Sequence, residues 1–238
     1  MTLRPAEPML DLPPLPRRAS TAQTVASVLR SQIAGGRILP GVQLREERIA
    51  ASLEVSRNTV REAFRLLSQE RLVEHALHRG VFVRVVGPEE IRDIYRTRGL
   101  VEPLGLRATA ADPAILAGIR NLLEQARAAA AEGDWDAVGT ADIAFHRQLV
   151  AACNSVHLST MFEGLLAELR LAFLRLADPR GLHEPFLERN DAILDLLERS
   201  DVEGATAQMR DYLAAAESRL LEAIDTPTHP AHPSRRTS

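Results

Sequence analysis

Four polar side chains lie at helical spacing in one short stretch of the chain and could together read nucleic acid. The front of this predicted helix carries Arg57, Asn58, Arg61 and Arg65, and its back carries Val60, Ala63, Phe64 and Leu67. Guanidinium groups bind phosphates and guanine edges, and an amide can pair with adenine. Ser56 can cap the first turn, because its hydroxyl can accept a backbone N–H that has no partner inside the helix. The pattern predicts a DNA-recognition helix; a solvated helix in another kind of domain is the alternative.

Two further helices are predicted before this one. Residues 21–34 have the apolar spacing of a helix, and the segment 35–41, rich in glycine and proline, ends it and turns the chain. Ile49 and Leu53 form the apolar stripe of a second, shorter helix, which stops at a tight break over residues 54–56. Helix, turn and helix in this order are what place a recognition helix on DNA.

A β-hairpin is predicted after the recognition helix. Residues 78–80 read as a turn, and apolar residues alternate over 81–85 as in a short strand. Three helices followed by a hairpin make a winged helix-turn-helix, which we predict over residues 19–86. Arg79 and Gly80 would lie at the tip of the wing, where a glycine allows either the turn itself or a close approach to a sugar-phosphate backbone.

Charge is divided unevenly along the chain. Between Arg17 and Val86 twelve arginines stand against six acidic residues, whereas the whole chain of 238 residues carries a net charge of −3. A basic module joined to an acidic remainder would steer DNA to one end of the molecule. The chain has one cysteine, no apolar run near the ~18 residues of a membrane span and no signal-peptide pattern. We therefore expect a cytoplasmic protein with no membrane partner.

The rest of the chain is helical in pattern, so the predicted fold class is mostly α. Gly87-Pro88 forms a linker, and residues 89–224 divide into about six amphipathic helices joined by short connections, which favours an antiparallel all-α bundle. These helices are predicted at 89–110, 113–132, 135–153, 156–177, 184–199 and 202–223. The ends, residues 1–18 and 225–238, hold many prolines without periodicity and are predicted to be a disordered arm and tail.

The first part of the chain resembles the DNA-binding domain of the GntR superfamily of transcriptional regulators. The motif I-x-x-G-x-[IL]-x-P-G-x-x-L-x-E-x-x-[IL]-A runs from Ile33 to Ala50, and V-S-R, V-R-E-A and the wing R-G follow it. The resemblance implies that Arg57 and Arg61 contact bases and phosphates and that Thr59 supports such contacts. At position 58 the family more commonly has a small polar residue, and this chain has an asparagine instead. The predicted DNA-binding residues are Arg45, Arg48, Ser56, Arg57, Asn58, Thr59, Arg61, Arg79 and Gly80.

The second part resembles the FCD domain, the helical effector-binding bundle of the FadR subfamily. Residues 98–103 match R-x-x-[LVI]-E-P, residues 142–146 match D-x-x-F-H, and residues 189–194 and 201–213 match the last two helices. The resemblance implies a homodimer, more often a repressor, whose two winged helices meet the half-sites of a palindromic operator in double-stranded DNA. It also implies an effector that changes the affinity for the operator.

Many FCD domains hold a divalent metal ion through an aspartate and three histidines. Asp142 and His146, four residues apart, lie on one helix face and could share an ion. Asn190 and Tyr212 stand at the other two places, and neutral amide and phenol oxygens are poor replacements for imidazoles around zinc. We therefore assign no cofactor and regard Asp142 and His146 as the remnant of a metal site. A bound divalent metal such as zinc, or a plain hydrogen bond between these two residues, are the alternatives.

Arg98 is the candidate anchor of an effector. Helical phase turns it inward, and a buried arginine needs a partner. That partner is either Asp142 or Glu102, in a structural salt bridge, or the carboxylate of an effector, which a planar guanidinium suits. The resemblance favours a small organic acid, with acyl-coenzyme A thioesters as the alternative. The predicted effector-binding residues are Arg98, Asp142, His146, Asn190 and Tyr212.

The sequence thus predicts a metabolite-responsive, sequence-specific DNA-binding regulator and not an enzyme. Two functions from other classes remain as alternatives. One is a DNA-binding protein that responds to no effector. The other is a metal-dependent hydrolase that uses Asp142, His146 and a water, which two ligands on one helix support poorly.

Overall fold

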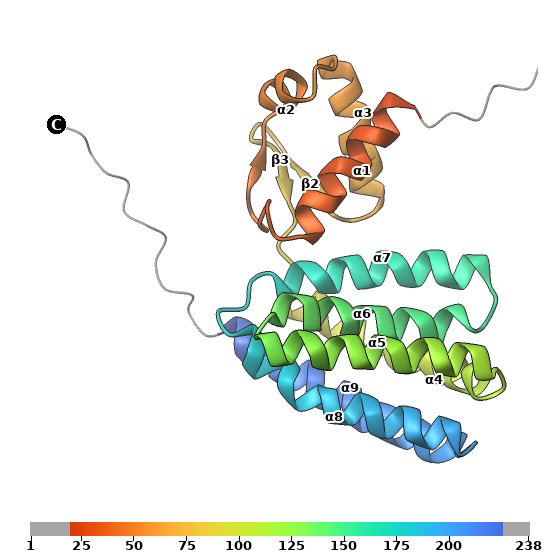
Figure 1. The fold of residues 1–238 in the computed structure, drawn as a ribbon. Helices are drawn as coiled ribbons and strands as arrows, with labels where there is room; N and C mark the ends of the chain where they lie inside the picture. The colour runs from red at the N-terminus through yellow and green to blue at the C-terminus, as the bar shows by residue number, and fades with distance from the viewer. Residues whose placement is uncertain (1–19, 226–238) are drawn as a thin grey trace, which may run out of the picture.

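A computed structural model describes residues 20–225, which form a small winged helix-turn-helix and a helical bundle (Figure 1). The winged helix lies against one side of the bundle, next to helix α7 (Val156–Phe173), and the two last helices lie on the far side. The predicted arm at 1–18 and all of the predicted tail except Asp225 fall outside the described residues. Asp225 itself is the last residue of a helix.

The predicted winged helix-turn-helix is confirmed, with one strand more than expected. Its helices are α1 (Thr21–Ala34), α2 (Glu46–Ser52) and α3 (Arg57–Gln69), and its strands are β1 (Gln43–Leu44), β2 (Val73–Ala76) and β3 (Gly80–Val83). The strands form an antiparallel sheet in the order β1-β3-β2, with Leu44 opposite Val81. The β2–β3 hairpin is the expected wing. Strand β1 was not predicted, because two residues are too few to show an alternating pattern.

Helix α3 forms as its sequence predicts. The Ser56 hydroxyl accepts the backbone N–H of Thr59 at 3.1 Å, so it caps the first turn. The four apolar residues of its inner face are all fully buried: Val60, Ala63, Phe64 and Leu67. The tight break before it places Glu54 at a φ of 53°, which lets the chain reverse between α2 and α3.

The six predicted bundle helices are all present. They are α4 (Pro88–Ala110), α5 (Pro113–Glu132), α6 (Trp135–Ala151), α7, α8 (Pro179–Glu198) and α9 (Val202–Asp225). The linker is shorter than predicted, because Gly87 is the N-cap of α4 and Pro88 its first residue. Among the described residues, no helix has the length and apolar character needed to cross a membrane.

The predicted start of α8 at residue 184 was wrong. The helix begins at Pro179, a residue suited to a first turn, and the Asp178 carboxylate caps it by accepting the Gly181 N–H at 3.0 Å. Pro185 consequently lies inside α8. Helix α7 ends at Phe173 and not at the expected residue 177.

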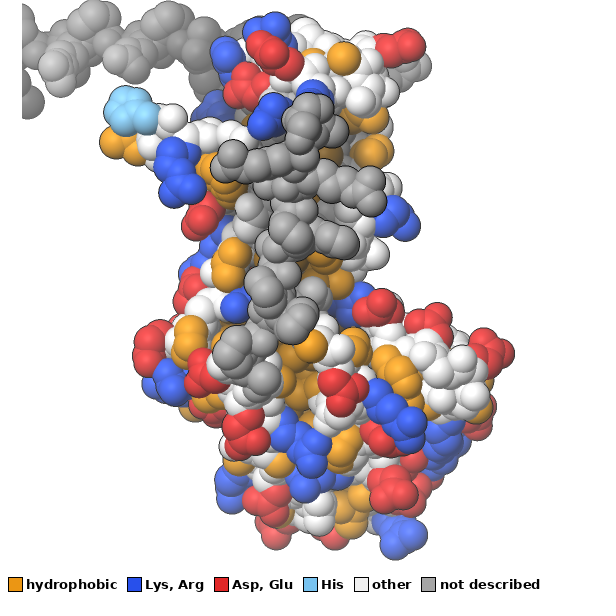
Figure 2. Space-filling model, turned by 90° about the vertical axis from the view of Figure 1, so that its left-hand side faces the viewer, with side chains coloured by type: hydrophobic (Ala, Val, Ile, Leu, Met, Phe, Trp, Pro, Cys, Tyr) orange, Lys and Arg blue, Asp and Glu red, His pale blue; other side chains and the backbone are white. Residues whose placement is uncertain are grey.

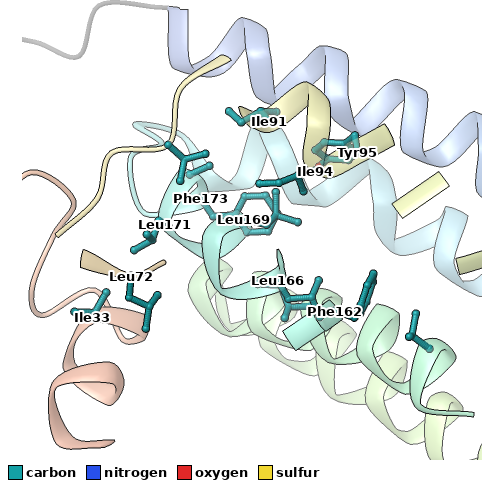
Figure 3. Close-up of a cluster of buried hydrophobic side chains, with 14 of the residues drawn as sticks. Ile33, Leu72, Ile91, Ile94, Tyr95, Phe162, Leu166, Leu169, Leu171 and Phe173 are labelled. Carbon is teal, nitrogen blue, oxygen red and sulfur yellow. The ribbon is translucent and has the colours of Figure 1, made fainter. Parts of the chain in front are cut away.

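The winged helix and the bundle share one buried core. In Figure 3, Ile33 of α1 and Leu72 lie near Leu171 and Phe173 of α7, and the cluster continues into α4 through Ile91. These side chains are at most 6 % exposed. The hydrophobic contact therefore crosses the junction without a gap.

Ion pairs, of which Arg84–Glu168 is nearly buried, reinforce this junction. The Glu168 side chain of α7 is only 8 % exposed. One of its oxygens accepts a hydrogen bond from the Arg84 guanidinium at 2.8 Å, and the other lies 3.1 Å from Nε of Arg71. Arg84 also pairs with Glu90 at the start of α4. We call Arg71, Arg84, Glu90 and Glu168 the junction cluster. The junction cluster links the end of the wing to two bundle helices. A shift of either helix would therefore change the position of the winged helix.

Candidate DNA-binding and effector sites

The outer face of α3 presents three arginines to solvent. Their side chains are 61 % (Arg57), 63 % (Arg61) and 69 % (Arg65) exposed. Each guanidinium lies beside a carboxylate: Arg57 near Glu47 at 3.0 Å, Arg61 near Glu46 at 2.8 Å and Arg65 near Glu62 at 3.2 Å. Exposed pairs of this kind contribute only about 0–1 kcal/mol, so phosphates can displace the carboxylates at little cost.

The polar residues at the start of α3 divide into two roles. The Asn58 side chain is exposed and makes no hydrogen bond within the described part of the protein, so its amide is available to a base. Ser56 and Thr59 share a hydroxyl–hydroxyl hydrogen bond of 2.8 Å. Because the Ser56 hydroxyl also caps the helix, both side chains hold the start of α3 in shape.

The remaining predicted DNA-binding residues lie on α2 and on the wing. Arg45, at the N-cap of α2, and Arg48 are both exposed. At the wing tip Gly80 has a φ of 101°, a conformation that the hairpin turn needs and that side chains rarely adopt. The Arg79 guanidinium lies 5.4 Å from the centre of the Phe82 ring. On the face drawn in Figure 2, arginines of the winged helix alternate with acidic residues.

The bundle brings all five predicted effector-site residues together in two neighbouring groups of polar contacts in its interior. Nε of Arg98 donates to Glu102 at 2.6 Å, and the other Glu102 oxygen lies 2.7 Å from Nδ1 of His146. Oδ1 of Asp142 accepts the Asn190 amide at 2.9 Å and the Tyr212 hydroxyl at 2.7 Å. Helices α4, α6, α8 and α9 each supply part of these two groups, which together we call the core cluster.

Arg98 therefore pairs with Glu102 and not with Asp142. Both side chains are at most 1 % exposed. The suggested direct hydrogen bond between Asp142 and His146 is absent, because Nε2 of His146 lies 3.8 Å from Oδ1 of Asp142.

Two residues near the core cluster were not among the predicted site residues. The Arg98 guanidinium lies 4.9 Å from the centre of the Tyr95 ring, one turn earlier on α4, and the helical phase of Arg98 could have indicated this neighbour. His183 is buried beside Gly139, where any Cβ would lie 2.6 Å from its Nε2. Sequence spacing gave no signal for that contact between α6 and α8.

Electrostatics keeps the two carboxylates of the core cluster ionised. Burial raises the pKa of Glu102, but Arg98 and His146 outweigh it, so the pKa lies below its ordinary value. Burial likewise opposes ionisation of Asp142, yet the two nearby imidazoles and the hydrogen bonds from Tyr212 and Asn190 lower its pKa. Burial and the charge of Asp142 raise the pKa of the Tyr212 phenol well above 10, so this hydroxyl stays a donor.

Three buried atoms of the core cluster have no hydrogen-bond partner among the described residues. They are Nη2 of Arg98, Nε2 of His146 and Oδ1 of Asn190. An unsatisfied buried polar atom costs roughly 1–3 kcal/mol, so three together point to an occupant. The adjoining cavity, lined by Asp142, His183 and Asn190 among others, has a volume of only about 10 Å³. That is room for about one water, so a larger occupant requires the helices to separate.

The core cluster does not fit the metal centre that the resemblance implies. In place of two imidazoles, Asn190 and Tyr212 offer a neutral amide oxygen and a phenol oxygen, which are poor zinc ligands, and both side chains donate a hydrogen bond to Oδ1 of Asp142. Within residues 20–225, no three side chains of His, Cys, Asp or Glu are grouped so that they could hold an ion. The residues present thus form a hydrogen-bonded centre around Asp142.

Comparisons with known proteins agree with this division into two domains. Residues 21–83 match the family described as bacterial regulatory proteins, gntR family, and residues 93–215 match the FCD domain. The probable D-xylose utilization operon transcriptional repressor of Paenarthrobacter nicotinovorans is 31 % identical, over 82 % of this chain and 88 % of its own. The gluconate operon transcriptional repressor of Bacillus licheniformis is 29 % identical, over 75 % and 73 %.

A solved structure gives the same result. A GntR transcriptional regulator from Rhodococcus sp. RHA1 superposes with a TM-score of 0.81 at 41 % identity, over 86 % of this chain and 99 % of its own. The superposition covers most of this chain and therefore includes both the winged helix and the all-α bundle. The chain therefore belongs to the GntR family of bacterial transcriptional regulators and carries an FCD domain behind its winged helix-turn-helix.

Proposed function

We propose that the protein is a homodimeric repressor whose affinity for a palindromic operator changes when a small organic acid binds in the core cluster. The observation that carries this proposal is the set of three unpaired buried atoms, two of them on the side chains of Arg98 and His146. A carboxylate can accept from the free guanidinium nitrogen, and hydroxyl groups can pair with the imidazole and the amide oxygen. A polyhydroxy acid therefore matches the site chemically.

The relatives support the same chemical class. The proteins similar to this chain include gluconate operon repressors and the galactonate operon transcriptional repressor of Escherichia coli, which is 26 % identical. Both names contain sugar acids with one carboxylate and several hydroxyls. The protein would act in the cytoplasm, where a bacterial operator lies.

The junction cluster offers a physical route from effector to DNA. Arg98 lies on α4, and the same helix carries Glu90, which pairs with Arg84 at the end of the wing. An acid that binds to the Arg98 guanidinium must separate the bundle helices, because the present cavity is too small to hold it. The resulting movement of α4 would change the placement of the two winged helices on successive half-sites.

Footprinting followed by effector titration tests this proposal. The full chain is expected to protect a palindromic sequence near its own gene, and gluconate or galactonate is expected to change its affinity at least tenfold. Acetate serves as the control carboxylate without hydroxyls. Protection of no defined sequence would contradict the operator, and an affinity that no sugar acid alters would contradict the effector.

The second candidate is a DNA-binding protein without an effector, which the closed core favours, since about 10 Å³ admits no organic acid. The titration above distinguishes it from the first proposal. Asp142 and His146 receive no catalytic role in either, because a catalytic metal needs more ligands than these two, and no group of three His, Cys, Asp or Glu side chains that could hold an ion lies within residues 20–225.

A further inference from the structure

A cleft between helices α4 and α9 lies outside the core cluster. Its described lining residues all belong to these two helices, and none of them is a member of the core cluster. The cleft has a volume of about 220 Å³, whereas the cavity beside Asp142 has about 10 Å³. The larger volume is that of about seven water molecules in the liquid, so a small organic molecule fits there without any separation of the helices.

The floor of this cleft is apolar. Tyr95, Met209 and Leu213 are at most 5 % exposed, and Pro103 adds its ring on the α4 side. An apolar body placed on this floor is stabilised because it leaves water. A sugar acid, which carries a hydroxyl on almost every carbon, gains little from such a floor. The cleft therefore favours a flat and apolar body, such as an aromatic ring.

The α4 wall of the cleft carries a backbone acceptor that lacks its helical donor. Pro103 has no N–H, so it cannot donate a hydrogen bond to the carbonyl of Gly99, four residues earlier. Both residues line the cleft. A Cβ at Gly99 would meet no neighbouring residue within 4 Å, so this part of the wall is open. A hydroxyl group on a ligand can supply the donor that the proline lacks.

The rim of the cleft carries more positive than negative charge. Arg210 is exposed and forms no ion pair with any described residue. The Arg96 side chain is 70 % exposed and lies 3.1 Å from Asp93, in a surface pair that contributes little to stability. One carboxylate, Glu217, stands against these two guanidinium groups. The rim therefore suits an anion, and a carboxylate can accept two parallel hydrogen bonds from one guanidinium.

We propose that the α4–α9 cleft binds an aromatic carboxylate. The carboxylate pairs with Arg210, the ring lies on the apolar floor, and a ring hydroxyl, where present, donates to the Gly99 carbonyl. The site is separate from the core cluster, so this binding does not depend on the proposed sugar-acid effector. The two sites nevertheless share Tyr95, which lines the cleft and whose ring centre lies 4.9 Å from the Arg98 guanidinium. A molecule in the cleft thus contacts a direct neighbour of the core cluster.

Isothermal titration calorimetry of the full chain with 4-hydroxybenzoate tests this site. The expected dissociation constant is about 1 mM or lower, within the range that is usual for a ligand of about ten non-hydrogen atoms. The amide 4-hydroxybenzamide has the same shape without the charge and should bind at least tenfold more weakly. No heat of binding, or equal affinity for the acid and the amide, would overturn the proposal.

A substitution that fills the cleft locates the binding. Gly99→Leu occupies the open wall and should weaken binding of the acid at least tenfold. Gly118→Leu is the matched control, because this helical glycine of α5 lies outside the cleft and a Cβ there would make only an ordinary contact, 3.8 Å from the Gln148 side chain. If Gly99→Leu binds the acid as tightly as wild type does, the cleft is not the site.

Two arginine variants separate the cleft from the core cluster. Arg210→Gln changes only an exposed side chain and is expected to weaken binding of the acid at least tenfold. Arg98→Lys should leave the affinity within threefold of wild type. Loss of binding in Arg98→Lys, with full binding in Gly99→Leu and Arg210→Gln, would place the acid in the core cluster and overturn the proposal. These titrations contain neither DNA nor a sugar acid, so their outcome is independent of the operator experiment.

Discussion

At the scale of single residues, the core cluster is a set of charged and polar side chains in the bundle interior, three of whose buried atoms have no hydrogen-bond partner among the described residues. Arg98, Glu102 and His146 form a continuous chain, and Asp142 has two donors of its own. Removing one member leaves its neighbour charged and unpaired, which costs about 3–5 kcal/mol in a buried site. The cluster therefore contributes to the fold as well as to the proposed effector site.

Asn190 and Tyr212 decide whether the core cluster can bind a metal ion. Replacing them, as Asn190→His with Tyr212→His, would put two imidazole lone pairs where an N–H and an O–H now face Asp142. We expect the double variant to retain about one zinc per chain after dialysis, measured by elemental analysis, while wild type retains less than a tenth of that. A wild type that keeps stoichiometric zinc, lost again in Asp142→Asn, would contradict our description of the site.

The lowered pKa values of Asp142 and Glu102 predict a dependence of stability on pH. A carboxyl group whose pKa is lower in the folded protein binds fewer protons there, so its stabilising contribution is present above its unfolded pKa of about 4. That contribution is lost as the pH falls from about 5 through the lowered folded values. Urea unfolding from pH 7 to pH 3 should show this fall, with a shallower slope in Asp142→Asn; equal slopes would contradict it.

At the scale of secondary structure elements, the ion pairs of the junction cluster link the winged helix to the bundle. Glu168 lies between two arginines and is nearly buried, whereas Glu163, on the same helix, has a side chain 50 % exposed and pairs with Arg147. These two glutamates allow a matched comparison within α7.

Glu168→Gln is expected to lower the free energy of unfolding by about 3–5 kcal/mol, because it leaves Arg84 short of its buried partner. Glu163→Gln should cost less than about 1 kcal/mol, as for other exposed pairs. Urea titration of the full chain measures both. Similar losses in the two variants would show that the junction depends on apolar packing alone.

The elements that were predictable are those with a local signal. Helix α3 could be predicted from the sequence because its cap, its apolar face and its arginines all lie within fourteen consecutive positions, 56–69. Strand β1 was not, because two residues acquire their strand geometry only by pairing with β3. The start of α8 was misjudged because both Pro179 and Pro185 suit a first turn, and only the Asp178 cap selects the earlier one.

The same limit applies to the candidate site. Its five residues could be found from motifs, and helical phase indicated that Arg98 is buried. The partner of Arg98 and the donors to Asp142 could not be chosen, since they depend on how four helices meet. His183 was not assigned to the site for the same reason, since its place is set by the bare backbone at Gly139.

At the scale of the whole molecule, the protein has a basic, exposed recognition helix at one end and a buried ionic cluster in the bundle, with a continuous core between them. Coupling between the two sites means that binding of an effector in the bundle changes the affinity of the winged helix for DNA. Arg61 is the proposed DNA contact and Arg98 the proposed effector contact, so variants of each should affect operator binding and effector response separately.

Operator affinity by fluorescence anisotropy, with and without a sugar acid, tests this most directly. Wild type should bind tightly and change at least tenfold with the acid. Arg61→Ala should bind about 1–3 kcal/mol more weakly in both conditions, and Arg98→Lys, which keeps the charge, should bind as wild type does without responding. If Arg61→Ala binds the operator as tightly as wild type, or if Arg98→Lys still responds in full, the account of a two-part switch is contradicted.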